Sequence, residues 1–242
     1  MRSRRLRIAN FSTNHPHSRI CVSISFILPL RYMNYHFITI EGNIGAGKTT
    51  LAHLLSRKYN ARLILEEFAD NPFLSKFYEN PQQYAFPLEL FFMAERYKQL
   101  NELIHTKDLF QSVTITDYLF TKCLLFAKVN LQEAEFRLYQ KLFDIIHQQL
   151  AKPEILIYLH APVNKLQVNI KKRNRPYEQA IPDEYLFNIQ QTYTNYIRQS
   201  NIKTLFVDAS NADFLGNEKH LKVVTDALEK DHDYGQHYLS LP

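Results

Sequence analysis

One eight-residue run, Gly42-Asn43-Ile44-Gly45-Ala46-Gly47-Lys48-Thr49, constrains the fold of this chain more than any other feature. It fits the pattern G-x-x-x-x-G-K-[ST] and lies between an apolar run at 35–41 and a helical pattern that begins at residue 48. Glycines let backbone N–H groups turn inward around phosphate oxygens, and the N-terminus of the following helix adds the positive end of its dipole. The motif predicts an α/β protein that binds the phosphates of a nucleoside triphosphate.

The residue types inside this motif indicate which cofactors to expect. Lys48 can place its charge on the β- and γ-phosphates, and the hydroxyl of Thr49 can ligate Mg²⁺. We therefore expect ATP and Mg²⁺, with residues 42–50, including Thr50, forming the nucleotide-binding loop. GTPases, motor ATPases and small-molecule kinases share this loop, so it does not identify the phosphoryl acceptor.

Beyond residue 33 the chain alternates short apolar runs with longer helical patterns, which is typical of a parallel sheet flanked by helices. The pattern predicts one domain over 33–242. Five strands are expected, at 35–41, 62–65, 113–116, 155–159 and 205–208. Helices are expected near 48–59, 82–106, 118–128, 131–150, 162–173, 183–199 and 217–229. The C-terminal tail with His232, Asp233 and His237 is interpreted as a solvated, mobile end in preference to a metal site.

The formal net charge of +5 does not indicate a nucleic-acid partner. Residues 1–32 hold six arginines and no acid, so the rest of the chain carries a net charge of −1. The basic excess therefore belongs to the leader, and we expect no nucleic acid as a partner. No apolar run of 18 residues occurs, so we expect no membrane span.

The leader, residues 1–32, has three interpretations. The first takes Met33 as the natural first residue, the second takes the leader as a targeting segment, and the third takes it as an ordered extension of the domain. Its Arg- and Ser-rich composition resembles a transit peptide, and its apolar run at 20–30 resembles the core of a signal peptide. In each case the chemistry is expected outside it. With only Cys21 and Cys123, a reducing compartment is expected. We predict a cytoplasmic location, with a mitochondrial one as the alternative.

The segment 41–50 resembles the opening of the deoxynucleoside kinases, salvage enzymes that phosphorylate the 5′-hydroxyl of deoxynucleosides. Further segments match in the same order, at 66–74, 77–81, 86–99, 173–179 and 206–214, so the resemblance covers 34–229. It implies a P-loop kinase fold with a five-stranded parallel sheet and an Arg-rich lid. It also implies an ATP-dependent kinase similar to bacterial deoxyadenosine and deoxyguanosine kinases, and a homodimer.

Glu66 is the candidate catalytic base. It closes the second predicted strand, at the carboxyl edge where ligands bind in open α/β sheets. A carboxylate there can accept the proton of a sugar hydroxyl, which is the role that the resemblance implies. The alternative is a surface or helix-capping acid.

Glu89 and Arg96 lie seven residues apart in an apolar helix and therefore share one face. They form either a structural ion pair or a pair that reads the nucleobase, and the resemblance implies the second. Arg96 matches the family, whereas Glu89 replaces its usual glutamine. A carboxylate only accepts hydrogen bonds, so Glu89 favours a base with an amino donor over thymine. We expect a purine deoxynucleoside, deoxyadenosine ahead of deoxyguanosine.

Two further groups of residues take roles from the resemblance. Tyr78 and Glu178 match the pair that holds the 3′-hydroxyl of the sugar. The basic run at 171–175 is a solvated helix end, a weak nucleic-acid patch or the lid. The resemblance implies the lid, whose Arg173 and Arg175 close over the transferring phosphoryl group.

The third predicted strand departs from the family pattern. The family carries an acid followed by Arg and Ser, whereas here Asp117 is followed by Tyr118. Asp117 remains placed to hold Mg²⁺ or to assist the base. Lys122, one helical turn after Tyr118, is a hypothetical substitute for the arginine.

Two alternative functions stay open at this point. One is a nucleoside monophosphate kinase similar to thymidylate kinase. It would need a further basic site for the phosphate of its acceptor, and no Arg cluster beyond Arg96 occurs near 66–96. The other is a non-catalytic nucleotide-binding subunit of a heterodimeric kinase, which the tyrosine at position 118 suggests.

Overall fold

The computed structural model describes residues 34–66, 71–105 and 111–242. These residues belong to one compact unit, Tyr32–Pro242. The predictions about the leader, including Cys21, lie outside the described residues. No helix in the described part of the chain has the length and apolar character needed to cross a bilayer.

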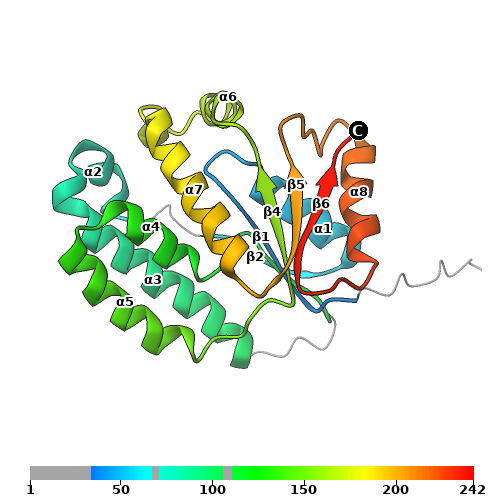
Figure 1. Ribbon diagram of the computed structural model, residues 1–242, viewed down its shortest axis with the longest axis horizontal. Coiled ribbons are helices and arrows are strands. Elements are labelled where there is room, and N and C mark those ends of the chain that lie inside the picture. Colours follow the sequence, from blue (N-terminus) through cyan, green and yellow to red (C-terminus); the bar gives the residue numbers. More distant parts are fainter. Residues whose placement is uncertain (1–33, 67–70, 106–110) are drawn as a thin grey trace, which may run out of the picture. The chain divides into compact units, whose positions relative to one another are not determined.

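The described strands form a single parallel sheet of six strands, in the order β2-β3-β1-β4-β5-β6 (Figure 1). They are β1 Phe37–Gly42, β2 Arg62–Ile64, β3 Thr114–Thr116, β4 Ile155–His160, β5 Lys203–Asp208 and β6 Gly235–Ser240. The five predicted strands are all present, with bounds shifted by one or two residues. This arrangement is the predicted α/β fold.

The sixth strand corrects the prediction for the C-terminal tail. Residues 235–240 pair in parallel with 203–208 at the edge of the sheet, so the tail is ordered β-structure. The imidazole nitrogens of His232 and His237 bond the carbonyl oxygens of Ala227 and Asp233, at 2.8 and 2.9 Å. The described residues contain no cluster of three or more His, Cys, Asp or Glu side chains arranged to hold a metal ion. Edge strands are half exposed and carry polar residues, which hides them from an apolar pattern search.

The described helices are α1 Lys48–Tyr59, α2 Leu74–Glu79, α3 Pro81–His105, α4 Lys122–Asn130, α5 Glu133–His147, α6 Val163–Arg173, α7 Asp183–Gln199 and α8 Glu218–Leu228. Two elements were not predicted, α2 and a short 3₁₀ turn at Pro176–Glu178. Helix α4 begins at Lys122, four residues later than predicted, because residues 118–121 form a turn after β3.

Each face of the sheet is covered by helices (Figure 1). On one face, buried Ile38, Ile40 and Ile157 pack with residues of α1, α6 and α8. On the other, Leu156 and Tyr158 pack against α7 and α4. Helices α3, α4 and α5 share a further apolar cluster. Strands buried on both faces read as continuous apolar runs, which explains why the sequence pattern located them.

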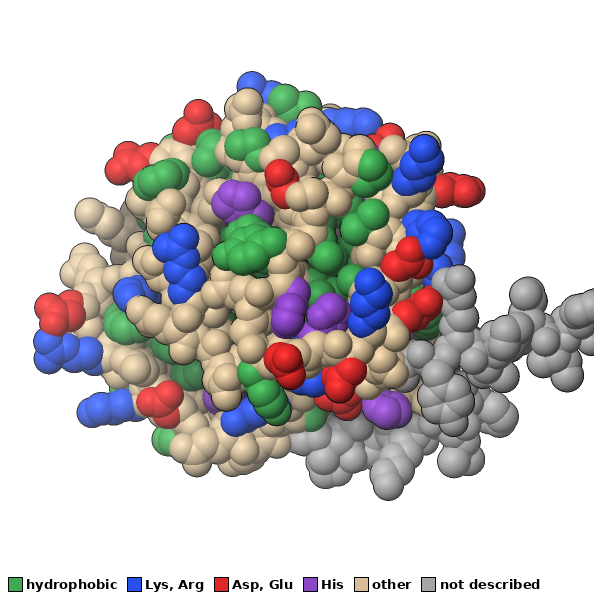
Figure 2. All heavy atoms as spheres, turned by 45° about the vertical axis from the view of Figure 1, so that its right-hand side comes forward, with side chains coloured by type: hydrophobic (Ala, Val, Ile, Leu, Met, Phe, Trp, Pro, Cys, Tyr) green, Lys and Arg blue, Asp and Glu red, His purple; other side chains and the backbone are tan. Residues whose placement is uncertain are grey.

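Charged side chains of both signs are interspersed on the face that Figure 2 shows. This distribution agrees with the net charge of −1 that the sequence leaves for the chain after its leader.

Candidate active site

The phosphate loop connects β1 to α1 through backbone conformations that only glycine adopts easily. Gly45 and Gly47 have φ angles of 81° and 94°. A Cβ atom on Gly45 would lie 2.8 Å from the carbonyl oxygen of Leu166 in α6, so α6 packs directly on the loop. Gly47 caps the N-terminus of α1. The loop therefore has the shape that the sequence motif requires.

Lys48 lies across the mouth of this loop. Its ammonium group donates to the carbonyl oxygens of Gly42 and Asn43, at 2.9 and 3.0 Å. Burial and the nearby charge of Lys122 lower the pKa of Lys48 to about 8, although three nearby carboxylates oppose the shift. Lys48 remains largely charged at neutral pH, as a phosphate-binding residue must.

Glu41 is a buried carboxylate at the end of β1 for which the sequence analysis gave no role. Its side chain accepts hydrogen bonds from the backbone N–H of Gly42 at 3.0 Å and of Leu119 at 2.8 Å, and from the Tyr193 hydroxyl at 2.8 Å. Burial raises its pKa. Glu41 thereby ties the phosphate loop to the turn after β3 and to α7. An acid in an otherwise apolar strand was the signal that could have revealed it.

Asp117 makes a similar connection at the end of β3. One of its oxygens accepts from the Thr49 hydroxyl at 2.6 Å, and the other accepts from the backbone N–H of Glu66 at 2.7 Å. A hydroxyl and a carboxylate in contact at the phosphate loop are the oxygen ligands that Mg²⁺ takes beside substrate phosphates. Their chemistry and placement fit the metal site predicted from the sequence.

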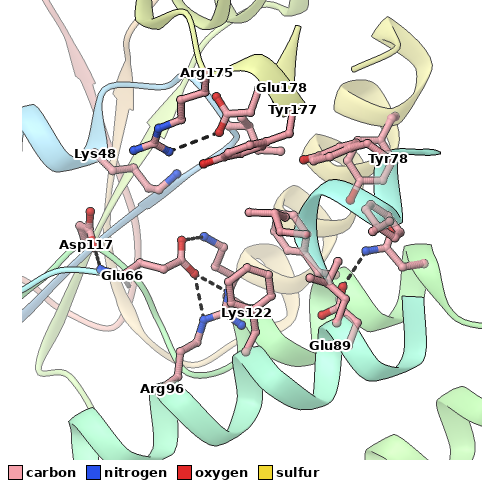
Figure 3. A pocket seen from close by; sticks show the side chains of 18 of the residues that line it. Lys48, Glu66, Tyr78, Glu89, Arg96, Asp117, Lys122, Arg175, Tyr177 and Glu178 are labelled. Atoms are coloured by element: carbon pink, nitrogen blue, oxygen red, sulfur yellow. Dashed lines mark hydrogen bonds and ion pairs between the residues drawn. The ribbon is translucent and has the colours of Figure 1, made fainter. Parts of the chain in front are cut away.

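Glu66 lies between two cations inside the hollow drawn in Figure 3. Arg96 donates to Oε1 through Nε at 2.9 Å and also through Nη2, and the Lys122 ammonium group contacts Oε2 at 2.5 Å. The side chains of Glu66, Arg96 and Lys122 are 12%, 4% and 7% exposed. Burial alone would raise the pKa of Glu66, but the charges of Lys122, Arg96 and Lys48 outweigh it and hold the pKa well below its usual range. Glu66 is therefore ionised at neutral pH.

Glu89 and Arg96 do not form the ion pair that the sequence analysis considered as one alternative. Arg96 pairs with Glu66, and its Nη1 donates to the Cys123 sulfur at 3.0 Å. Glu89 accepts instead from the Asn130 amide nitrogen at 2.6 Å. Both residues line the same hollow from α3. A shared helix face predicted their proximity to the hollow but not their partners.

The lid begins where α6 ends. Asn174 adopts a left-handed conformation, with φ of 56°, between Arg173 and Arg175. Both arginines pair with the buried carboxylate of Glu178, Arg175 at 3.3 Å. The lid also stacks on the residue predicted to hold the sugar, because the rings of Tyr78 and Tyr177 are 6.3 Å apart and nearly parallel.

One hollow brings together every catalytic and substrate-binding residue that the sequence analysis named. These are Lys48, Glu66, Tyr78, Glu89, Arg96, Asp117, Arg173, Arg175 and Glu178, together with the metal-ligand candidate Thr49. The same hollow contains residues that the sequence analysis missed, among them Phe92, Phe126, Asn130, Tyr177 and Tyr185. Nothing in a single sequence distinguishes such aromatic residues from core.

A second hollow lies beside the phosphate loop. It is lined by Gly45–Thr50, by residues of α6 and by the segment after β5, including Ala209 and Phe214. Lys48, Thr49, Arg173 and Arg175 border both hollows. Two binding spaces thus meet at a lysine, a hydroxyl and two arginines, which is the arrangement needed to pass a phosphoryl group from one ligand to another.

Tyr118, which replaces the arginine of the family pattern, points elsewhere. It is buried in the cluster shared by α3, α4 and α5, and its hydroxyl donates to the Gln99 side chain at 2.6 Å. Lys122 lies in the hollow on Glu66. The departure from the family pattern therefore does not leave Glu66 without a second cation.

This fold and pair of hollows define a P-loop phosphotransferase, and comparison with known proteins identifies the family. The model of the deoxynucleoside kinase family matches residues 38–232. The chain is 39% identical to deoxyguanosine kinase of Bacillus subtilis, over 75% of this chain and 90% of that protein. It is 34% identical to deoxyadenosine kinase of Dictyostelium discoideum, over 66% of each. The structure of M. mycoides deoxyadenosine kinase with bound dATP has the same fold, with a TM-score of 0.70 at 23% identity over 80% of this chain and all of that one.

The chain therefore belongs to the deoxynucleoside kinase family, and it is an ATP-dependent kinase of that family. The resemblance stated from the sequence is confirmed.

The Glu66 cluster predicts a coupled effect on stability. Glu66→Gln removes the charge between two buried cations and should lower the free energy of unfolding by about 1–3 kcal/mol. Adding Lys122→Met should recover part of this loss, because one cation then no longer lacks a counter-charge. Urea denaturation of the two single variants and the double variant measures the coupling. Strictly additive effects would contradict the ion pairs described here.

Proposed function

We propose that this kinase transfers the γ-phosphoryl group of ATP to the 5′-hydroxyl of a purine deoxynucleoside in nucleotide salvage. The 5′-oxygen bonds to the γ-phosphorus, the bond from that phosphorus to the β-phosphate oxygen breaks, and the hydroxyl proton passes to Glu66. The observation that carries the proposal is the ionised carboxylate of Glu66 in a hollow that shares Lys48, Arg173 and Arg175 with the phosphate loop. The purine preference is supported by the relatives named deoxyguanosine kinase and deoxyadenosine kinase.

Glu66 first orients the hydroxyl and accepts its proton late, once bonding to phosphorus has made the hydroxyl acidic. A carboxylate with a lowered pKa is a weak base, but it is always ready to accept a hydrogen bond. Phosphoryl transfer passes through a loose transition state in which positioning and charge stabilisation dominate. Each carboxylate oxygen has more than one acceptor site, so Glu66 can hold the hydroxyl while Arg96 and Lys122 fix its own direction.

The remaining charges act on the phosphates. Lys48 and the two lid arginines neutralise charge that spreads over the transferring group. Thr49 and Asp117 would hold Mg²⁺, which would supply a further positive charge beside the phosphates. Arg173 and Arg175 pair with Glu178 in this structure. In the proposed complex they would exchange part of this contact for phosphate oxygens, which would leave Glu178 able to contact the sugar hydroxyl.

We further propose a homodimer in the cytoplasm. The α5 residues Leu138 and Ile145 are 52% and 62% exposed, which supports burial of that face against a second copy. Sedimentation equilibrium tests the assembly, and a mass equal to the 28.7 kDa chain would contradict it. Imaging of a fluorescent fusion in the source cell tests the location, and signal confined to an organelle would contradict it.

The nucleoside monophosphate kinase alternative requires cations for the acceptor's own phosphate. Among the described residues lining the first hollow, each cation already has a role: Arg96 and Lys122 hold Glu66, while Lys48, Arg173 and Arg175 serve the phosphates of ATP. This arrangement supports an acceptor without a phosphate.

Release of ADP, measured with the four deoxynucleosides and their monophosphates, tests the proposed function. We expect turnover with purine deoxynucleosides, none with monophosphates, and none when EDTA removes Mg²⁺. Glu66→Gln should lower kcat by about 10²- to 10⁴-fold while leaving ATP binding intact. The matched control Glu184→Gln changes an exposed acid of α7 and should leave kcat unchanged. Turnover with monophosphates alone, or an undiminished kcat for Glu66→Gln, would refute the proposal.

Lys122 should act as the cation that replaces the arginine of the family pattern by holding Glu66 in place. Lys122→Ala should lower kcat by about ten- to hundredfold with a smaller effect on the KM for ATP, because Glu66 loses one of the two groups that direct it. Lys122→Arg should retain part of the activity, and Lys128→Ala, an exposed lysine of the same helix, should retain all of it. Steady-state kinetics of the three variants test this role. An unchanged kcat for Lys122→Ala would show that Lys122 is not needed to hold Glu66 in place.

A further inference from the structure

Glu89 is a buried acid whose hydrogen bonding is incomplete. Its side chain is held in α3 and the residue is 2% exposed. Oε1 accepts from Asn130, at the end of α4, at 2.6 Å, whereas Oε2 has no partner among the described residues. An unpaired buried carboxylate oxygen is costly, so this atom points to a donor on a ligand.

The surroundings of Glu89 suit a flat, apolar ligand. Figure 3 shows Glu89 at the opposite end of the hollow from Lys48, beyond Glu66. The same hollow is lined by Phe77, Leu88, Phe92, Phe126 and Tyr185, aromatic and apolar side chains against which a nucleobase can stack. A deoxynucleoside with its 5′-hydroxyl at Glu66 would therefore place the polar edge of its base near Glu89.

The bases differ in the donors that this edge presents. Guanine offers two adjacent donors, the N1–H and the 2-amino group. Adenine and cytosine each offer one amino donor beside a ring acceptor, and thymine offers one N–H between two carbonyl acceptors. A carboxylate accepts only, so it pairs fully with guanine and faces a lone pair in adenine or cytosine.

We propose that Glu89, held by Asn130, selects guanine as the base of the deoxynucleoside acceptor. The proposal rests on the kinase function proposed above and names the acceptor of the same site. It reverses the order expected from the sequence, in which deoxyadenosine came first. Oε2 has no partner in the described part of the chain, and Oε1 keeps a second lone pair beside the one that accepts from Asn130. The two oxygens can therefore accept two adjacent donors, which among the four bases only guanine presents.

The electrostatic surroundings of Glu89 make this selection depend on pH. Burial raises the pKa of Glu89 to about 7, and the Asn130 hydrogen bond and the charges of Arg96 and Lys122 oppose the shift. Five further titratable groups interact electrostatically with Glu89. They are Glu66 at the end of β2, Tyr78 in α2, Cys123 in α4, Tyr139 in α5 and Tyr185 in α7. The ionised form accepts both guanine donors. The protonated form can instead donate to N1 of adenine while accepting from its amino group.

Glu89→Gln is the variant that separates the two bases. Asn130 donates to Oε1, so the glutamine oxygen should occupy that place and leave the amide nitrogen where Oε2 lies. The nitrogen can donate to N1 of adenine but opposes the N1–H of guanine. The ratio of kcat/KM for deoxyguanosine to that for deoxyadenosine should therefore fall by about ten- to hundredfold. Glu95→Gln, an acid of α3 that is absent from the residues lining the hollow, should leave the ratio unchanged.

Two measurements on the unaltered protein keep the proposal testable if Glu89→Gln does not fold. Deoxyinosine lacks the 2-amino group, so its kcat/KM should lie well below that of deoxyguanosine. The ratio of kcat/KM for deoxyguanosine to that for deoxyadenosine should rise from about pH 6 to about pH 8, as Glu89 loses its proton. Taking a ratio cancels the titration of ATP and of the other catalytic groups, because these act on both substrates.

The outcomes separate the two proposals. In one outcome, the kinase turns over several deoxynucleosides without preferring deoxyguanosine, and Glu89→Gln leaves the deoxyguanosine-to-deoxyadenosine ratio of kcat/KM unchanged. That outcome overturns guanine selection and leaves the proposed kinase function standing. Absence of turnover with every deoxynucleoside overturns the proposed function and this inference together. Guanine selection is supported if the deoxyguanosine-to-deoxyadenosine ratio of kcat/KM is high and rises with pH in the unaltered protein. In Glu89→Gln this ratio should be low and independent of pH.

Discussion

The Glu66 carboxylate, held between Arg96 and Lys122, is the interaction on which the rest of the site depends. Three charged groups from the end of β2, from α3 and from α4 are buried together, and removing Glu66 leaves two buried cations without a counter-charge. Because the cations outweigh the cost of burial, the carboxylate stays ionised and aimed into the hollow. The cluster thus places an acceptor for a hydroxyl proton at a fixed point near the phosphate loop.

Acids at the ends of neighbouring strands hold this edge of the sheet in register. Glu41, at the end of β1, accepts the backbone N–H of Leu119, which follows β3. Asp117, at the end of β3, accepts the backbone N–H of Glu66, which follows β2. A buried hydroxyl contact of 2.8 Å between Thr39 and Thr116 adds a further link between β1 and β3. The phosphate loop and Glu66 are therefore positioned through the same short chain of hydrogen bonds, which is the preorganisation that phosphoryl transfer requires.

The sequence predicted the fold and the members of the site better than it predicted their partners. Buried parallel strands and the phosphate loop have strong local patterns, and the family resemblance placed Glu66, Glu89 and Glu178 near one ligand, in agreement with the hollow that all three line. Strand β6 escaped because an edge strand carries polar, half-exposed residues. The contacts of Lys122 with Glu66 and of Asn130 with Glu89 join residues 56 and 41 positions apart, and no local pattern encodes such pairs.

A crystal structure with deoxyguanosine and a non-hydrolysable ATP analogue tests the central claim most directly. The account predicts the 5′-oxygen of the nucleoside within hydrogen-bond distance of the Glu66 carboxylate, on a line from it to the γ-phosphorus, with Arg96 and Lys122 still in contact with Glu66. A 5′-oxygen bound by another side chain, with Glu66 turned away from it, would contradict the account.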